Sequence, residues 1–173
     1  KTYTGFTHDA TNENNVLSGN IAGDGSLVLK VYYTRNSYTV TYQYSNHVTG
    51  ESTLPDTATY KFEEEVTVAE DATADGYTFS GWSTSDATIA GGKFSMPAQN
   101  VTISGGWTAN TDTKYTTENY LEKLDGSYEL KESVDSTGVT DTQAEAVVKT
   151  YTGFTFDEAD ENNGLSGNIA GDG

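Results

Sequence analysis

The chain has 173 residues, and its 26 acidic side chains against 9 basic ones give a formal net charge of −17. Such a surface repels phosphate groups, which excludes nucleic acid and anionic membranes as expected partners. The absence of cysteine excludes disulfides and thiolate metal sites. Twelve tyrosines, six phenylalanines and eighteen glycines favour strands and turns, so the predicted fold class is mainly β (α+β).

The first 25 residues of the chain recur near its end. Lys1–Gly25 is matched by Lys149–Gly173 at a spacing of 148 residues, with identity at 20 of the 25 positions. This match predicts a parent protein that repeats every 148 residues. The five changes fall on polar or loop positions, such as His8, which becomes Phe156. In an active site, the polar residues would be expected to stay the same between the copies.

Residues 1–36 are predicted to be the C-terminal part of a module. The repeated segment runs into SLVLKVYYTRN, Ser26–Asn36, which is rich in apolar, β-branched and aromatic residues and is bounded by Gly and Asn-Ser. This composition predicts a strand. By the repeat period, another copy of this strand is expected to follow Gly173.

Residues 37–110 are predicted to form a complete module of 74 residues. Its opening segment, SYTVTYQYS, alternates in the way expected of an antiparallel strand. Further strands are predicted over Lys61–Val68 and within Gly76–Ser83, and the segment Phe94–Asn110 closes the module with a last strand. The side chains expected on one face of the opening strand are Tyr38, Val40, Tyr42 and Tyr44.

Three motifs in this stretch carry a resemblance to a known family. YTVTY, GYTFSGW and FSMPAQNVTISGGW follow one another in this order. Together they resemble the Listeria-Bacteroides repeat, also called the internalin B-repeat, over nearly all of residues 37–110. The resemblance implies a small extracellular β module of a bacterial surface protein.

Residues 111–173 are predicted to be the N-terminal part of a further module, which lacks its last strand. YTTENYLEKLDGSYEL contains a hairpin turn at Leu124–Ser127, Thr142–Tyr151 is expected to be a short helix, and Lys149–Phe156 a strand. This order resembles the mucin-binding-protein repeats of Gram-positive adhesins, once a strand like Ser26–Asn36 closes the module. The resemblance implies a β-grasp, ubiquitin-like fold, and hence β-grasp modules in tandem.

The acidic loop Asp157–Gly173 offers the only candidate for metal binding in the sequence. Its oxygen ligands suit a hard cation such as calcium, with Asp157, Asp160 and Asp172 as candidate ligands. The spacing does not follow an EF-hand, and the first copy of the loop has two fewer carboxylates. The competing interpretation is a turn-rich loop in which Asn and Asp bond their own backbone. No cofactor is predicted.

Trp82, Tyr42 and Tyr44 are the candidates for ligand binding, because faces of Trp and Tyr commonly build sugar sites. The competing interpretation is that these rings fill the thin core of a small β module. No catalytic residues are predicted. The two histidines, His8 and His47, belong to no nucleophile, base or paired-ligand pattern.

These observations predict a non-catalytic repeat segment of a secreted bacterial adhesin or fibre, extracellular and attached to the cell wall or assembled on the surface. Head-to-tail modules would act as a stalk or spacer. The predicted partners are neighbouring copies of the repeat, joined by strand complementation through Ser26–Asn36. The alternative is a multivalent module that binds host mucin glycans or proteins by avidity.

Overall fold

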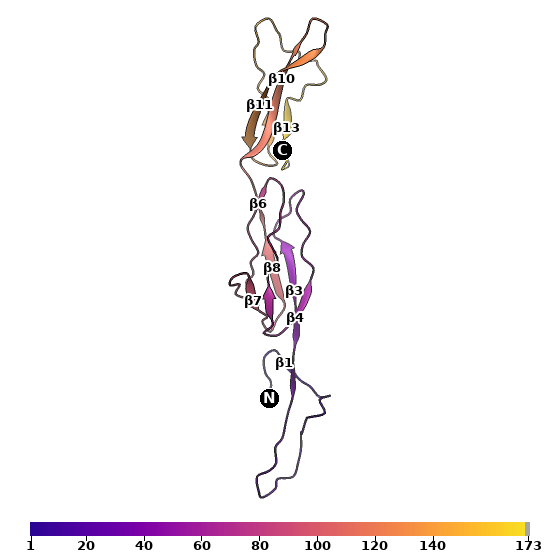
Figure 1. Cartoon of the computed structure of the whole chain (residues 1–173), viewed down its shortest axis with the longest axis vertical. Coiled ribbons are helices and arrows are strands. Elements are labelled where there is room, and N and C mark those ends of the chain that lie inside the picture. The colour runs from indigo at the N-terminus through magenta and orange to yellow at the C-terminus, as the bar shows by residue number, and fades with distance from the viewer. Residues whose placement is uncertain (172–173) are drawn as a thin grey trace. The chain divides into compact units, whose positions relative to one another are not determined.

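The computed structural model describes residues 1–171, and within that range the chain is built of strands and loops without helices (Figure 1). The mainly β prediction is confirmed. No helix long and apolar enough to cross a bilayer occurs among the same residues. The chain divides into two compact units, each described by itself. Unit 1 comprises Lys1–Ser45, Leu54–Asp71 and Gly81–Gly105, and unit 2 comprises Asn46–Thr53, Ala72–Ser80 and Gly106–Gly173.

Residues 37–110 contribute to both units, so the units do not follow the sequence ranges 1–36, 37–110 and 111–173. Those three ranges stay predictions from the repeat period.

Unit 1 begins with a short antiparallel pair, β1 (Phe6–His8) and β2 (Tyr33–Arg35). Of the strand predicted over Ser26–Asn36, only β2 forms. An isolated bridge between Val16 and Lys30 is the other ladder contact of that segment among the described residues. A segment becomes a strand only when a neighbour satisfies its backbone groups, and residues 26–32 have little of this support.

The main sheet of unit 1 has the order β4-β3-β8 (Figure 1). Its central strand β3 (Ser37–Tyr44) is antiparallel to β4 (Ala58–Lys61) and parallel to β8 (Val101–Gly105). The predicted alternation of the opening strand is confirmed, since Val40 and Tyr44 are buried. The antiparallel pairing expected for this strand is found on its β4 side, whereas β8 pairs with it in parallel.

The strand predicted over Lys61–Val68 is broken by a turn. β4 ends at Lys61, Glu63 takes a left-handed backbone conformation with φ of 64°, and the Glu64 amide donates to the Lys61 carbonyl at 2.9 Å. The chain then enters β5 (Glu65–Thr67), which pairs with β7 (Lys93–Ser95) in a separate two-stranded sheet. The turn carries Val66 to the core, where it lies opposite Phe94 in the ladder.

The core of unit 1 lies between these two sheets. It gathers buried side chains from β3, β5, β7 and β8 and from Met96 directly after β7, with tyrosines and Trp82 packed around them. The buried members are Val40, Val66, Phe94, Met96, Val101 and Ile103.

The described residues of unit 2 form three antiparallel pairs. β6 (Tyr77–Phe79) pairs with β9 (Trp107–Ala109), where the rings of Phe79 and Trp107 lie 4.8 Å apart. β10 (Thr113–Glu122) and β11 (Tyr128–Gly138) form the long hairpin seen in Figure 1. The third pair is β12 (Gln143–Glu145) with β13 (Ser166–Asn168).

The hairpin turn predicted at Leu124–Ser127 is confirmed. Gly126 adopts φ of 80°, and the carboxylate of Asp125 accepts the Ser127 amide at 3.0 Å. The Lys123 amide donates to the Ser127 carbonyl at 2.7 Å and closes the loop.

The helix expected over Thr142–Tyr151 is wrong, because β12 occupies its first turn. A segment of this length is marginal as an isolated helix, whereas the edge of β13 offers three paired positions. The strand expected over Lys149–Phe156 is also wrong for the described structure, since these residues form a turn and extended loop. Within residues 1–171, Phe154–Phe156 has no neighbouring strand, whereas the equivalent residues of the first copy pair with β2.

Replacing Ile103 with Ala removes a fully buried side chain from the unit 1 core. We expect a loss of about 2–5 kcal/mol in the free energy of opening. Native-state hydrogen exchange of the β3 and β8 amides measures that free energy within unit 1. The matched control is Ile21→Ala, because Ile21 is 92% exposed. Similar exchange in the two variants would contradict this assignment of the core.

Candidate functional site

The structure brings together the three aromatic residues singled out from the sequence. The ring of Trp82 lies 5.0 Å from Tyr42 in an edge-on contact and 5.7 Å from Tyr44 in a stacked contact. The Tyr42 hydroxyl accepts the Ala69 amide at 2.9 Å, and Trp82 Nε1 donates to the Glu70 carbonyl at 2.9 Å. Tyr44 is buried, and the other two rings pack against the core. Much of each ring is therefore used in packing, as the competing interpretation expects.

In the acidic loop, the candidate carboxylates bond their own backbone. Asp157 accepts the Ala159 amide at 3.0 Å, and Asp160 accepts the Asn162 amide at 2.8 Å. The hydrogen bond from the backbone amide of Asn162 lowers the pKa of Asp160, and the side-chain amide of Asn162 lowers it further. Asp172 lies outside the described residues. Within residues 1–171, no three His, Cys, Asp or Glu side chains are grouped as a metal would require.

The two copies of the repeated segment fold alike at their turns. The Phe6 amide donates to the Tyr3 carbonyl at 3.1 Å, and the Phe154 amide donates to the Tyr151 carbonyl at 3.1 Å. The glycine inside each turn is left-handed, with φ of 77° in the first copy and 84° in the second. The turn geometry therefore belongs to the segment itself.

The first part of the loop after the turn, up to Asn15 and Asn163, is also alike in the two copies, whereas beyond it only the second copy forms a strand, β13. Asn15 Nδ2 donates to the Asp9 carbonyl at 2.7 Å, and Asn163 Nδ2 donates to the Asp157 carbonyl at 2.7 Å. Sequence reasoning does not single out either asparagine as functional. The signal was present, because both copies keep this residue while the neighbouring position changes from Val16 to Gly164.

The copies differ in pairing. In the first copy, Phe6–His8 is strand β1, opposite β2. In the second copy, the same positions, Phe154–Phe156, belong to no ladder among residues 1–171. Both phenylalanines are partly exposed to solvent. Sequence alone therefore does not decide whether this segment is a strand, since its neighbour does.

A groove of about 1560 Å³ lies beside this unpaired segment in unit 2. Its lining includes β10 from Tyr115 to Glu122 and the apolar side chains of Phe154, Phe156 and Leu165. Asn119, at the β10 bulge, has a buried Nδ2 without a hydrogen-bond partner in the described structure. Polar residues such as Glu118, Asp157 and Asn163 line the groove beside these apolar side chains.

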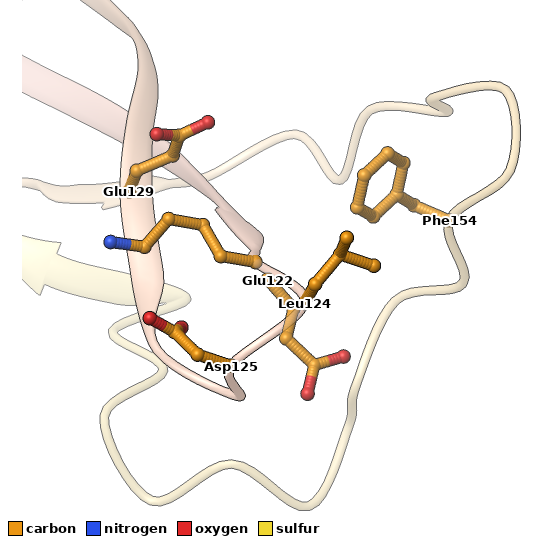
Figure 2. Close-up of a pocket in the computed structure, with 6 residues that line it drawn as sticks. Glu122, Leu124, Asp125, Glu129 and Phe154 are labelled. Atoms are coloured by element: carbon orange, nitrogen blue, oxygen red, sulfur yellow. The ribbon is translucent and has the colours of Figure 1, made fainter.

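A smaller cavity of about 520 Å³ lies at the hairpin end of the same unit. Figure 2 shows the carboxylates of Glu122, Asp125 and Glu129 pointing in different directions. The ring of Phe154 lies on the side of Leu124. The carboxylates drawn there do not converge on one point, as paired general acid and base groups would.

A side-chain network that the sequence did not reveal ties the repeated segment to the hairpin. Glu132 of β11 accepts a hydrogen bond from the Tyr151 hydroxyl and pairs with Lys149 Nζ at 3.0 Å. The bond to Glu132 raises the pKa of Tyr151 to about 12, with smaller contributions from burial and from the carboxylate charge. The two partners lie far apart in the sequence, so spacing could not indicate the pair.

Comparison of the chain with protein-family models, curated proteins and solved structures found no match. The resemblances to the Listeria-Bacteroides and mucin-binding-protein repeats therefore stay expectations drawn from the motifs.

Replacing Glu132 with Gln removes the charged acceptor of the Tyr151 hydroxyl. The pKa of Tyr151 should fall from about 12 toward its ordinary 10.0. The folded-state pKa of Tyr151 is raised, so the hydrogen bond stabilises the folded chain fully below pH 10.0. This stabilisation disappears as the pH rises through about 12. Titration by NMR of ring-labelled tyrosine measures the shift, with Glu129→Gln as the control. An unchanged Tyr151 pKa in Glu132→Gln would contradict the pairing.

Proposed function

We propose that this chain is a non-catalytic repeat segment of a secreted bacterial cell-surface adhesin or fibre. In this proposal, β modules joined head to tail act as a stalk or spacer outside the cell. The observation that carries the proposal is the first part of the repeated segment, up to Asn15 and Asn163. It keeps the same turn and loop hydrogen bonds in both copies, with its polar groups bonded to its own backbone. A repeating structural unit requires this reproducibility.

Contacts at the start of the second predicted module support a stalk. In unit 1, the Asn36 amide donates to the Gly5 carbonyl and the Phe62 amide donates to the Asn36 carbonyl, both at 2.8 Å. Arg35 reaches the Phe62 carbonyl at 3.0 Å and pairs with Glu63. Backbone and side-chain bonds thus fix residues 1–36 to the β4–β5 turn, as a spacer that resists bending would need.

A second set of contacts fixes the start of the third predicted module to residues 76–110. In unit 2, the buried Thr140 hydroxyl donates to the Gly76 carbonyl at 2.7 Å and lies 2.7 Å from the Thr113 hydroxyl. The Thr140 amide donates to the Asn110 carbonyl at 3.0 Å. The Tyr77 hydroxyl also bonds the carboxylate of Asp141. Buried hydroxyls whose hydrogen bonds are all made favour a single arrangement of the segments that they join.

A multivalent glycan- or mucin-binding module is the second candidate. The gathering of Trp82, Tyr42 and Tyr44 in one ring cluster favours it. The same cluster also has a packing role, so the spacer function ranks first.

Binding of the whole chain to mucin and to a glycan array separates the two candidates. A spacer should give no saturable signal. Saturable binding that Trp82→Ala abolishes and that Trp82→Phe retains in part would overturn the spacer proposal in favour of ring-mediated sugar binding. Circular dichroism of each variant checks that the fold is kept.

Replacing Gly76 with Ala tests the Thr140 contacts. A Cβ at Gly76 would lie 2.4 Å from Gly171 Cα and 2.9 Å from the Thr140 hydroxyl. The matched control is Gly50→Ala, because Gly50 has a similar φ of 74° but open space around it. We expect Gly50→Ala to cost about 1 kcal/mol and Gly76→Ala about 1–3 kcal/mol more, measured by urea unfolding. Equal losses would contradict a close-packed joint at Gly76.

A further inference from the structure

We propose that β3 and β8 form a mechanical clamp, which lets residues 37–110 carry tension along the chain without extending. Load enters this range at Ser37, the first residue of β3, and leaves unit 1 at Gly105, the last residue of β8. The two strands are parallel neighbours, so this load shears the ladder between them (Figure 1). The inference specifies the mechanical task of the proposed stalk and rests on that function for its biological role.

The direction of the two strands decides how the ladder is loaded. In a parallel pair, the beginning of one strand and the end of the other lie at opposite ends of the ladder. Tension applied at Ser37 and Gly105 therefore acts along the strands, and the facing residue pairs resist it together. These pairs are Val40–Val101, Thr41–Thr102, Tyr42–Ile103, Gln43–Ser104 and Tyr44–Gly105.

Each end of the ladder carries an additional hydrogen bond. At the beginning of β8, Asn100 Oδ1 accepts the Thr39 amide at 3.0 Å. Directly after β3, the Ser45 amide donates to the Gly105 carbonyl at 2.8 Å. These bonds secure the ladder at the points where the load enters and leaves it.

Apolar side chains cover one face of the ladder. Val40, Val101 and Ile103 are fully buried, and Tyr44 is 8% exposed. A hydrogen bond is electrostatically stronger in such surroundings than in water. Water is also kept away from backbone groups for which it would compete during sliding. The buried core therefore strengthens the ladder against shear.

Both strands of the clamp are also bonded on their other edges. β3 pairs with β4 on the side away from β8. On β8, the Ser104 amide donates to the Ser83 carbonyl at 2.8 Å and the Ser83 amide donates to the Ser104 carbonyl at 2.9 Å. The carboxylate of Asp86 accepts the Thr102 amide at 2.9 Å. Each strand is thus fixed to the rest of unit 1, and the load acts on the ladder between them.

The β10–β11 hairpin of unit 2 has the opposite geometry. Its ends, Thr113 and Gly138, face each other at one end of an antiparallel ladder. Tension that enters at Thr113 and leaves at Gly138 therefore opens the facing pairs one after another. The hairpin has more facing pairs than β3 and β8, but only one of them bears load at a time. Strand direction, and not the number of pairs, makes β3–β8 the clamp.

The test pulls the same ladder in two directions. The chain has no cysteine, so paired substitutions to Cys provide unique handles for single-molecule force spectroscopy. The shear variant carries Ser37→Cys and Thr108→Cys, the latter just beyond Gly105. The matched control carries Ser37→Cys and Gln99→Cys, so its handles lie at the beginnings of both strands and unzip them. All three substituted positions are exposed. Equal free energies of unfolding in urea confirm that the variants differ only in the direction of pulling.

We expect the shear variant to rupture at a force at least about threefold higher than the control at the same loading rate. The reason is that several facing pairs share the load in one direction, whereas one pair bears it in the other. Rupture should release the chain that lies between the two strands and lengthen the molecule by about 200 Å. Equal rupture forces in the two variants would overturn the clamp.

The clamp and the stalk function can fail separately. Pulling measures the ladder, whereas the stalk function is challenged by saturable binding to glycans. A rupture force that depends on direction, in a chain that binds no glycan, supports both proposals. The same force pattern in a chain that binds glycans retains the clamp and replaces the spacer. A rupture force that is independent of direction removes the clamp and leaves the spacer proposal in place.

Discussion

The availability of a backbone partner is the constraint on which this chain depends most. Phe6–His8 and Phe154–Phe156 share nearly the same sequence, the same preceding turn and the same following loop. Only the first is a strand, because Tyr33–Arg35 lies beside it. Main-chain hydrogen bonds are made in pairs, so an edge segment has no ladder until a neighbour arrives.

The remaining structure holds such short strands in place with rings and a small core. In unit 1, two sheets enclose Met96, Ile103 and Val66, and the cluster of Trp82, Tyr42 and Tyr44 extends that packing. Unit 2 relies more on buried hydroxyls around Thr140 and on the long β10–β11 hairpin. Small β units of this size bury limited apolar area, so each contact between rings contributes a large share of their stability.

Local signals predicted the parts of the fold that depend on neighbouring residues. The Asp125-Gly126 turn and the alternation of Val40 and Tyr44 could be predicted because turn chemistry and period-2 patterning are local. The turn at Glu63 was missed since nothing in the glutamate run marks a left-handed residue. The helix expected at Thr142–Tyr151 failed because a strand partner 20 or so residues away decided its start. The candidate rings were found together, whereas the Glu132–Tyr151 pair depends on the fold and had no sequence signal.

Amide hydrogen exchange at two equivalent aspartates tests this account most directly. In the first copy the Asp9 amide donates to the Tyr32 carbonyl at 3.0 Å, and the Asp157 amide has no equivalent bond in the described structure. In a dilute solution of the chain, the account predicts that the Asp9 amide is protected and that the Asp157 amide exchanges rapidly. Equal protection of the two amides in the dilute chain would contradict the claim that a neighbouring strand, and not the segment's own sequence, decides its pairing.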